Sequence, residues 1–399
     1  MLFKKSLNTS NIMKKIFASD LDENVLSQFE ECMSCDFVID GALMPDAHFG
    51  YVAPIGAVLI TNGCVVPSWV GYDIGCGVIA LKLTGKDLLN KIKKNLDTVH
   101  NKVQRNVPMG LGRLNPEHKI TKETKEKFVN LLKKLEKSPH NDEILAYLKR
   151  KALSNLGSLG HGNHFIEIDT TGKDVWLIIH SGSRHMGHEV ASRYMKAAMN
   201  AKGKEGNAEQ TFEIDTKSKL GKEYLAVLDF LLSFALLNRM EIANEVVQGI
   251  EEAIGEKVKA TLWTNKNHNN AERIGKSQKF IHRKGATPSK KNEKGVIPGN
   301  MRDGTFLVIG KGNKDFLESS THGAGRAMSK TRARKEFTMQ EFKKSMKGIK
   351  ATIKEGTLDE APFAYKDIFK VMKEQKASVK VYKHLIPILN WKGESSKRF

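Results

Sequence analysis

Three glycine-rich, strand-like blocks separated by helical segments constrain the fold of this chain more than any other feature. Each block contains short apolar runs bounded by turn residues, as in Gly56–Ile60, Val78–Leu81 and Val175–Ile179. The blocks cover about residues 37–83, 159–188 and 260–325. The Lys- and Leu-rich segments between them have helical periodicity and cover about residues 86–152, 189–203 and 224–255.

This order does not follow the strict strand–helix–strand alternation of a parallel α/β fold. It predicts an α+β fold, with one large domain over residues 1–399 and a strand-rich core that carries helical insertions. The C-terminal part, 326–399, is predicted to be basic and helical, with a short helix after Asp367. The polar, breaker-rich segment 286–298 is predicted to be a mobile loop.

The net charge restricts the class of partner. The chain has 65 Lys and Arg against 45 Asp and Glu, a formal charge of +20. Such a surplus favours polyanions, because neutralised phosphates release condensed counterions. From Arg326 to Lys354, ten Lys and Arg face only two Glu. This segment is either a face that contacts a nucleic-acid backbone or an ordinary solvated helix.

The sequence shows no sign of membrane insertion. The apolar stretch Leu225–Leu237 is interrupted by Asp229 and is shorter than the roughly 20 residues that span a bilayer. No signal peptide is recognisable at the N-terminus, so a cytoplasmic location is predicted. Cys32 and Cys35 form a single CxxC pair, and two ordinary thiols are favoured over a redox or metal site.

The segment Val70–Val78 carries the first candidate metal ligands. Glycines at 71, 75 and 77 allow tight bends, so that the side chains of Asp73 and Cys76 can point at one place. A carboxylate and a thiolate three residues apart are half of a metal site. The alternative is a glycine-rich turn that holds a buried thiol.

Histidines cluster in the second strand-like block. Five of the 13 histidines lie between residues 161 and 188, at strand ends and beside glycines. His164 and His180 are the preferred ligands, because a rigid strand end fixes an imidazole. The other three have more polar surroundings and are predicted to contact phosphate or solvent: His161, His185 and His188.

Two further histidines lie in loops. His268 is in the polar segment 265–270 and, taken alone, is best explained as a surface residue. His322 is flanked by small residues and precedes a helical pattern, where a backbone can approach phosphate and Arg326 adds charge. A neutral histidine at such a place can be a nucleophile toward phosphorus. The alternative is a glycine-rich helix entry with an incidental histidine.

Taken together, these segments resemble the RtcB family of RNA-splicing ligases. The matching stretches occur in family order from about residue 37 to Lys392, so that the resemblance covers nearly the whole chain. They are Met44–Gly50, Val70–Val78, Leu159–Glu167, His180–Gly187, His268–Asn269, His282–Thr287, Thr321–Met328 and Asp359–Asp367.

The resemblance implies two Mn²⁺ ions bridged by the Cys76 thiolate. Asp73, Cys76 and His164 would hold one ion, and Cys76, His180 and His268 the other. His322 matches the histidine that becomes guanylylated, and Asp46 an acidic residue near the metals. The implied GTP contacts are Asn163, His164, Phe165, Ile166, Glu167, His268, Asn269, Pro298, Gly299, Asn300, Met301, Thr305, His322, Gly323, Ala324, Gly325 and Lys392.

The implied activity is GTP-dependent joining of an RNA 3′-phosphate or 2′,3′-cyclic phosphate to a 5′-hydroxyl, through a guanylylated histidine and an RNA-guanylate. The partners would be RNA ends and an archease-like activating protein, with the enzyme itself a monomer. A metal-dependent phosphoesterase acting on RNA ends is the alternative enzyme. An RNA-end-binding protein with a remnant site is the alternative without catalysis.

Two features of the sequence depart from this implication. By ligand affinity alone a Cys/His site favours zinc, so that manganese follows from the family and not from the ligands. The segment Asn300–Thr305 also differs from the usual family pattern, in which a serine follows Pro-Gly. Asn300 and Thr305 keep hydrogen-bonding capacity there, whereas Arg302 is bulkier.

Overall fold

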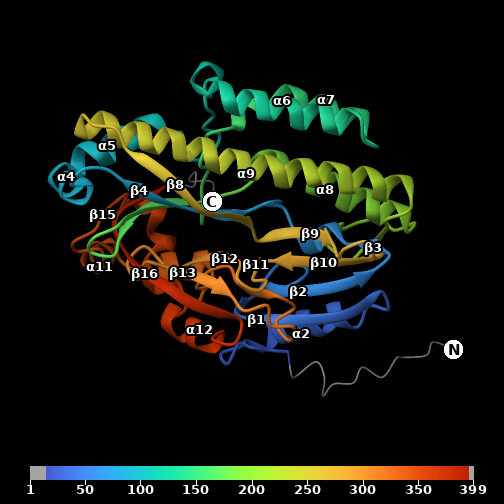
Figure 1. The fold of residues 1–399 in the computed structure, drawn as a ribbon. Helices are drawn as coiled ribbons and strands as arrows, with labels where there is room; N and C mark the ends of the chain where they lie inside the picture. Colours follow the sequence, from blue (N-terminus) through green and yellow to red (C-terminus); the bar gives the residue numbers. More distant parts are fainter. Residues whose placement is uncertain (1–14, 395–399) are drawn as a thin grey trace.

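The computed structural model describes residues 15–394, whose helices and strands form layers around a strongly curved sheet (Figure 1). Within these residues the main sheet has eight strands, in the order β12-β13-β16-β5-β6-β4-β8 with β15 beside β16. All neighbours on this path are antiparallel. The strands are β4 (Gly77–Thr84), β5 (Phe165–Thr170), β6 (Val175–Ser181), β8 (Lys259–Asn267), β12 (Lys294–Pro298), β13 (Thr305–Gly310), β15 (Lys350–Ala351) and β16 (Val379–Lys392).

A smaller sheet lies beside the main one and carries the segment of Asp46. In the described part of the chain it has four antiparallel strands, in the order β1-β2-β10-β9, accompanied by the pairs β11-β14 and β3-β7. The strands are β1 (Val38–His48), β2 (Ile55–Asn62), β3 (Cys64–Val65), β7 (Ile214–Asp215), β9 (Asn269–Arg273), β10 (Lys279–Lys284), β11 (Ala286–Pro288) and β14 (Ser319–Thr321).

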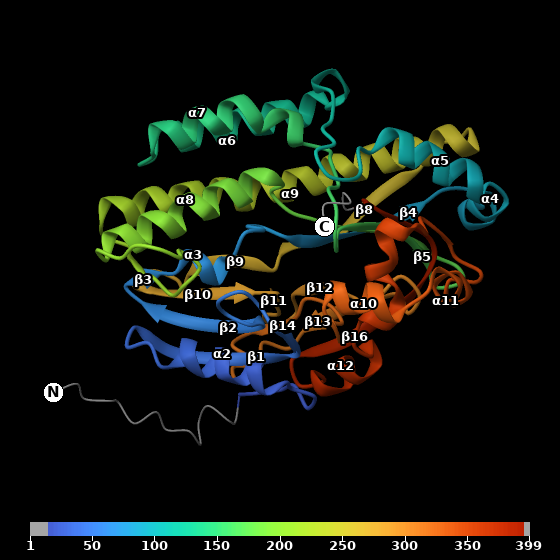
Figure 2. The same ribbon diagram turned by 180° about the vertical axis from the view of Figure 1, so that it is seen from behind.

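Helices cover the sheets on both sides (Figures 1 and 2). The longest described helix, α9 (Lys219–Ile254), begins after Ser218, whose side chain accepts from Gly221 N, and ends at Gly255, whose φ of 73° suits glycine. The other helices are α2 (Glu23–Met33), α3 (Pro67–Val70), α4 (Leu88–Lys94), α5 (Leu96–Asn106), α6 (Lys122–Glu136), α7 (Asp142–Lys151), α8 (His185–Ala201), α10 (Lys330–Glu336), α11 (Met339–Ser345) and α12 (Ile368–Glu374). Residues 15–394 also contain four 3₁₀ turns: η1 (Glu117–Lys119), η2 (Leu153–Asn155), η3 (Glu355–Glu360) and η4 (Pro362–Ala364). In the part of the chain that is described, no helix combines the length and apolarity needed to cross a membrane.

The main sheet curls until its edge strands nearly meet. Trp263 Nε1 on β8 donates to Gly295 O at 3.1 Å, and Thr264 Oγ1 donates to Lys294 O at 3.2 Å, both on β12. The two faces of the sheet bury different apolar clusters, as the alternation of side chains along a strand requires. The inner face packs Val78, Ala80, Trp176, Ile178, Val296, Leu307 and Leu385 together. The outer face packs Ile79, Leu81, Ile166, Ile168, Leu177 and Ile179 against Ile242, Val246 and Ile250 of α9.

The α+β class predicted from the sequence is confirmed, but the helical C-terminal part is wrong for its last third. Residues 379–392 form β16, which lies between β13 and β5 in the centre of the main sheet. The segment is rich in lysine, which suggested a solvated helix. Its odd-numbered positions are nevertheless mostly apolar, from Val379 to Trp391, and this period of two is that of a strand.

The mobile loop predicted at 286–298 is also wrong. β11 and β12 occupy its two ends, and Val296, Ile297 and Pro298 are buried. Only the short turn between the two strands, around Asn292, keeps the expected loop character. The loop prediction rested on the overall composition of the segment, which the polar residues of this turn dominate, and the short strands on either side were therefore missed.

A carboxyl pair lies on the inner face of β5. Glu167 and Asp169 are two residues apart, so that they share one face of the strand, and both are almost fully buried. Burial raises the pKa of both groups, and the nearby Glu167 raises the pKa of Asp169 further. Folding therefore favours the form of the pair that keeps a proton.

We expect this pair to make stability depend on pH. An acid with a raised folded-state pKa holds its proton more tightly than in the unfolded chain, so that stability falls as pH rises from about 4 through the folded pKa. Asp169→Asn mimics the protonated acid and should remove this loss. The thermal midpoint of the variant should exceed that of the wild type increasingly between pH 6 and 9, with about 1.4 kcal/mol gained per unit of pKa shift.

Asp142→Asn, at a carboxyl whose side chain is 98% exposed, is the matched control and should follow the wild type across the same range. Parallel pH profiles for the wild type and Asp169→Asn would contradict a proton held by the folded pair.

Candidate metal centre and nucleotide cavity

Antiparallel pairing brings the candidate ligands to one end of the main sheet. Cys76 precedes β4, His164 precedes β5, His180 is near the end of β6, and His268 follows β8. In the register, Val78 faces His180, Phe165 faces His180, and Gly77 faces Asn267. Strand starts and strand ends alternate along an antiparallel edge, and these four side chains therefore meet.

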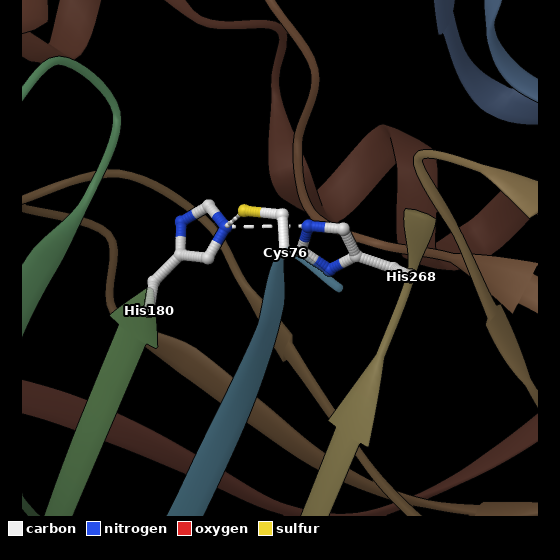
Figure 3. A group of neighbouring side chains, drawn as sticks. All are labelled: Cys76, His180 and His268. Atoms are coloured by element: carbon white, nitrogen blue, oxygen red, sulfur yellow. Dashed lines mark hydrogen bonds between the residues drawn. The ribbon is translucent and has the colours of Figure 1, made fainter. Parts of the chain in front are cut away.

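Cys76, His180 and His268 form a tight group that points into a common centre (Figure 3). Cys76 Sγ lies 3.1 Å from His180 Nε2, and His180 Nε2 lies 3.3 Å from His268 Nε2. All three side chains are buried. Two imidazole nitrogens and a sulfur that face one another at such distances form the donor set of a transition-metal site.

Asp73, Cys76 and His164 form a second group that shares the same sulfur. His164 Nε2 lies 2.9 Å from Asp73 Oδ2 and 3.4 Å from Cys76 Sγ. In each group the candidate ligand atoms lie within 4.8 Å of one another. The structure thus brings together all five residues that the sequence analysis named as ligands, and it puts the thiol between the two groups.

Backbone carbonyls orient two of the imidazoles. His164 Nδ1 lies 3.0 Å from Leu159 O, and His180 Nδ1 lies 3.1 Å from Asn163 O. A proton on each Nδ1 is donated to the carbonyl and leaves Nε2 free as a lone-pair donor at the centre. Metal-bound histidines are held by outer hydrogen bonds of this kind.

The protonation preferences of the group also fit a cation. Burial raises the pKa of the Cys76 thiol well above its usual value. Burial likewise lowers the pKa of His180 and His268 far below that of a free histidine, which keeps both imidazoles neutral. A cation that displaces the thiol proton would stabilise the thiolate in this buried site. The residues present therefore fit a metal requirement.

Arg239 of α9 fixes the strand ends that carry these ligands. Its guanidinium is fully buried, and Nη1 donates to Gly75 O at 3.0 Å and to Ser181 O at 2.8 Å. Nε and Nη2 donate to the side chains of Asn265 and Asn267 on β8, each at 2.7 Å. Burial lowers the pKa of Arg239 to about 10, so that it stays charged near neutrality.

Two glycines of the sequence motifs are required sterically. Gly75 has a φ of 72°, and a Cβ there would lie 2.8 Å from Ala235 Cβ of α9. A Cβ on Gly182 would lie 2.3 Å from Asp73 Oδ1. The loops that hold Asp73 and Cys76 can therefore pack closely only with glycine at both positions.

His322 lies beside the first group and is held by Asp46. Its ring centroid is 4.9 Å from that of His268. Asp46 Oδ2 lies 2.6 Å from His322 Nδ1, and it accepts a hydrogen bond from the His322 backbone N at 3.2 Å. Asp46 is on β1 and His322 directly follows β14, so that the smaller sheet and its neighbour bring the two residues together.

A cavity of about 270 Å³ opens next to His322. It has the mixture of apolar and polar lining that is typical of small-molecule sites. Of the nucleotide contacts implied by the resemblance, twelve residues line it: Asn163, Phe165, Glu167, Pro298, Gly299, Asn300, Met301, His322, Gly323, Ala324, Gly325 and Lys392.

The other implied contacts lie elsewhere. His164 and His268 belong to the ligand groups, and the Ile166 side chain packs on the outer face of the sheet. Asn269 donates to Asp73 O at 3.1 Å and accepts from Gly285 N at 2.8 Å, which ties two loops together. Thr305 donates to Glu167 Oε1 at 3.4 Å from beneath the cavity.

Sequence reasoning missed several residues that line the cavity. Lys330 and Tyr365 lie in segments considered for their charge or family motif alone, and Asn390 lies on the strand β16 that was predicted to be helical. Asn390 Nδ2 donates to Glu167 Oε2 at 2.7 Å. Recognising the alternation of β16 would have pointed to Asn390.

A buried charge network forms one wall of the cavity. Lys392 Nζ donates to Glu360 Oε2 at 2.7 Å, and the Tyr365 hydroxyl donates to the same oxygen. Although burial opposes it, the neighbouring Lys392, Lys330 and Arg326 lower the pKa of Glu360 to about 2. Basic side chains of the segment 326–354, for which RNA contact and a solvated helix were both left open, also pair within the protein, as Arg334 does with Asp359 at 2.9 Å.

The remaining sequence candidates lie outside both groups. His161, His185 and His188 are exposed, and Cys32 and Cys35 are free thiols, of which Cys32 is buried. A larger groove of about 780 Å³ runs between the end of α9 and β8, but none of the predicted site residues lines it. The chemistry of this site is therefore concentrated around the smaller cavity.

Known RNA ligases are similar to this chain along nearly its whole length. The family model described as tRNA-splicing ligase RtcB matches residues 28–393. An RNA-splicing ligase RtcB of Escherichia coli K12 is 31% identical over 381 residues, with 88% of this chain and 90% of the relative covered. A tRNA-splicing ligase RtcB of Nanoarchaeum equitans is 29% identical over 437 residues, with 91% of each chain covered.

An RNA-splicing ligase RtcB1 from another Escherichia coli strain is 31% identical over 382 residues, covering 88% of this chain. The family match spans the strands, the ligand loops and the cavity described above. The chain belongs to the RtcB family of tRNA-splicing ligases.

Proposed function

We propose that this protein joins an RNA 3′-phosphate or 2′,3′-cyclic phosphate end to a 5′-hydroxyl end, using GTP and a guanylylated His322. One observation carries the proposal: His322 lies between a thiol-centred pair of ligand groups and a nucleotide-sized cavity. Membership of the family supports an RNA ligase. RNA repair and tRNA splicing are the processes in which such ends arise.

Two Mn²⁺ ions are the proposed metals. Asp73, Cys76 and His164 would hold one, and Cys76, His180 and His268 the other. When bound, such ions neutralise phosphate charge and stabilise the oxyanions of phosphoryl transfer. The preference for manganese rests on the family, because these ligands alone favour zinc.

His322 is the proposed nucleophile. Asp46 holds the Nδ1 side of the ring, which leaves Nε2 to attack the α-phosphorus of GTP. The new N–P bond replaces the bond to the bridging oxygen, and pyrophosphate leaves. An oxygen of the RNA 3′-phosphate then takes the guanylate from the histidine. The 5′-hydroxyl finally attacks the activated 3′-phosphorus, loses its proton and displaces GMP; a cyclic end is first hydrolysed.

Glu167 is the proposed reader of guanine. It lines the cavity, with Asn390 and Thr305 donating to its two oxygens. With the proton of the buried pair on Asp169, whose pKa is raised further by its neighbour, the Glu167 carboxylate is ionised and matches the adjacent N1–H and N2–H donors of guanine but not adenine. The other eleven of the twelve implied contacts that line the cavity, including Asn300 and Met301 of the changed segment, would hold ribose and phosphates.

RNA with these ends is the proposed substrate. Action as a monomer, stimulation by an archease-like protein and a cytoplasmic location remain predictions from the sequence. They can be tested by solution scattering, by ligation with and without such a partner, and by cell fractionation.

The first prediction concerns the covalent step. Incubation with GTP labelled at the α-phosphate should label the wild-type protein, and His322→Ala should carry no label, because the nucleophilic nitrogen is gone. His118→Ala, at an exposed histidine of η1, should be labelled as the wild type is. Equal labelling of His322→Ala would exclude the proposed nucleophile.

The second prediction concerns metal content. Because Cys76 belongs to both ligand groups, Cys76→Ala should lose manganese at both, measured by elemental mass spectrometry of the purified protein. His268→Ala, which belongs to one group, should retain about half of the wild-type content. Cys64→Ala, at a buried thiol outside the groups, is the control. Wild-type content in Cys76→Ala would overturn the shared thiolate.

The third prediction concerns the base. Inosine lacks the N2 amino group, so that the wild type should be guanylylated more efficiently with GTP than inosylated with ITP. Glu167→Gln removes the negative acceptor and should reduce labelling by GTP about tenfold or more. The ratio of labelling efficiency with GTP to that with ITP should also become smaller than in the wild type. An unchanged ratio would place guanine recognition elsewhere.

A further inference from the structure

Four rings from three separate segments form a continuous row beside the metal centre. Tyr51 follows β1, Tyr72 immediately precedes Asp73, and His185 and His188 are in the first turn of α8. The aromatic row, as we name these four residues, has ring centroids 6.0 Å apart for Tyr51–Tyr72, 4.5 Å for Tyr72–His188 and 6.0 Å for His188–His185.

The geometry of the row is that of a stacking surface. The rings of Tyr72 and His188 are within 17° of parallel, and those of His188 and His185 are within 12°. Tyr51 meets Tyr72 at 87°, edge against face. A flat base placed against this row would continue an existing series of ring contacts.

Three of the four rings of the row are exposed, and Tyr72 is half-buried. Tyr51 is 75% exposed, His185 and His188 are both exposed, and the neighbouring Phe49 is 62% exposed. Neither the proposed metal groups nor the nucleotide cavity uses any of these side chains. Single exposed apolar side chains are ordinary, whereas a group of large exposed rings from distant segments often marks a binding surface.

The row is also held in place. The Tyr72 hydroxyl donates to Glu209, and the loop of Glu209 is tied to α3 by Ser68 Oγ donating to Gln210 O at 2.9 Å. Trp69 Nε1 donates to Thr211 Oγ1 at 3.2 Å in the same loop. A fixed platform loses little conformational entropy when a ligand binds to it.

The row is adjacent along the chain to both parts of the site. Asp73, next to Tyr72, is the most exposed member of its ligand group, with 35% of its side chain accessible against 5% for His164. His48, three residues before Tyr51, lines the nucleotide cavity. An RNA strand whose terminal phosphate lies at the metal centre therefore has this row among the surfaces near its end.

We propose that the aromatic row binds unpaired bases of the RNA strand whose end is at the metal centre; this rests on the proposed function and assigns its substrate-positioning surface. Every base has a face that can stack on these rings, so that recognition would be independent of sequence. The formal charge of +20 supplies the complementary attraction for the phosphates.

The test measures the affinity of the manganese-loaded full chain for a short unstructured RNA with a 3′-phosphate, by fluorescence anisotropy without GTP. Tyr51→Ala and His188→Ala should each weaken binding about tenfold, whereas Tyr51→Phe, which keeps the ring, should bind as the wild type does. Tyr382→Ala is the matched control, because Tyr382 is 52% exposed and stacks on Trp263 away from the site.

A second RNA that lacks the bases near its 3′ end separates stacking from phosphate contact. Removing these bases should weaken binding by the wild type and have little further effect on Tyr51→Ala, because the two changes delete the same contact. The salt dependence of binding should be the same for the wild type and Tyr51→Ala, since no phosphate contact is lost.

Equal affinity of the wild type and both alanine variants would overturn the proposal. So would a base-removal effect that persists undiminished in Tyr51→Ala, which would place the bases on another surface or leave the row to a protein partner. Absence of GMP labelling in the wild type would instead contradict the proposed function, and the affinity comparison does not depend on it.

Discussion

The buried guanidinium of Arg239 is the interaction on which the site depends. One planar cation donates to the loop before β4, to the end of β6 and to two asparagines of β8. These are three of the strand ends that carry the candidate ligands. A buried charge of this kind costs desolvation and is retained only where its donors are satisfied, as they are here. In return, the guanidinium holds the three strand ends, and the candidate ligands on them, in fixed positions.

With the strand ends fixed, the candidate ligand atoms of both groups gather at one centre. Cys76, His180 and His268 present a thiol and two lone pairs to one point, and Asp73 and His164 share the same sulfur from the other side. A buried thiol and neutral imidazoles gathered beside an ionised carboxylate have few favourable partners except a cation. The fold thus prepares a site whose electrostatic balance is completed by what binds there.

The closure of the curved sheet places the cavity next to this centre. β16 lies between β13 and β5, and from its last residues Asn390 and Lys392 reach the cavity wall. Tyr72, which directly precedes the candidate ligand Asp73, belongs to the exposed aromatic row. The metal groups therefore adjoin a pocket suited to a mononucleotide and are joined through the chain to an open surface suited to a polymer, as the proposed reaction of a nucleotide with RNA ends requires.

The sequence by itself determined the α+β class, the ligand types and the glycines that flank them, because these depend on local periodicity and on donor chemistry. It also placed Asp73 and Cys76 near each other, since three residues separate them. The tertiary structure alone decided that β16 lies between β13 and β5, that the aromatic row assembles, and that Arg239 ties the ligand loops together. Each of these depends on contacts between residues far apart in the chain, and local patterns do not record which strand ends an antiparallel register will bring together.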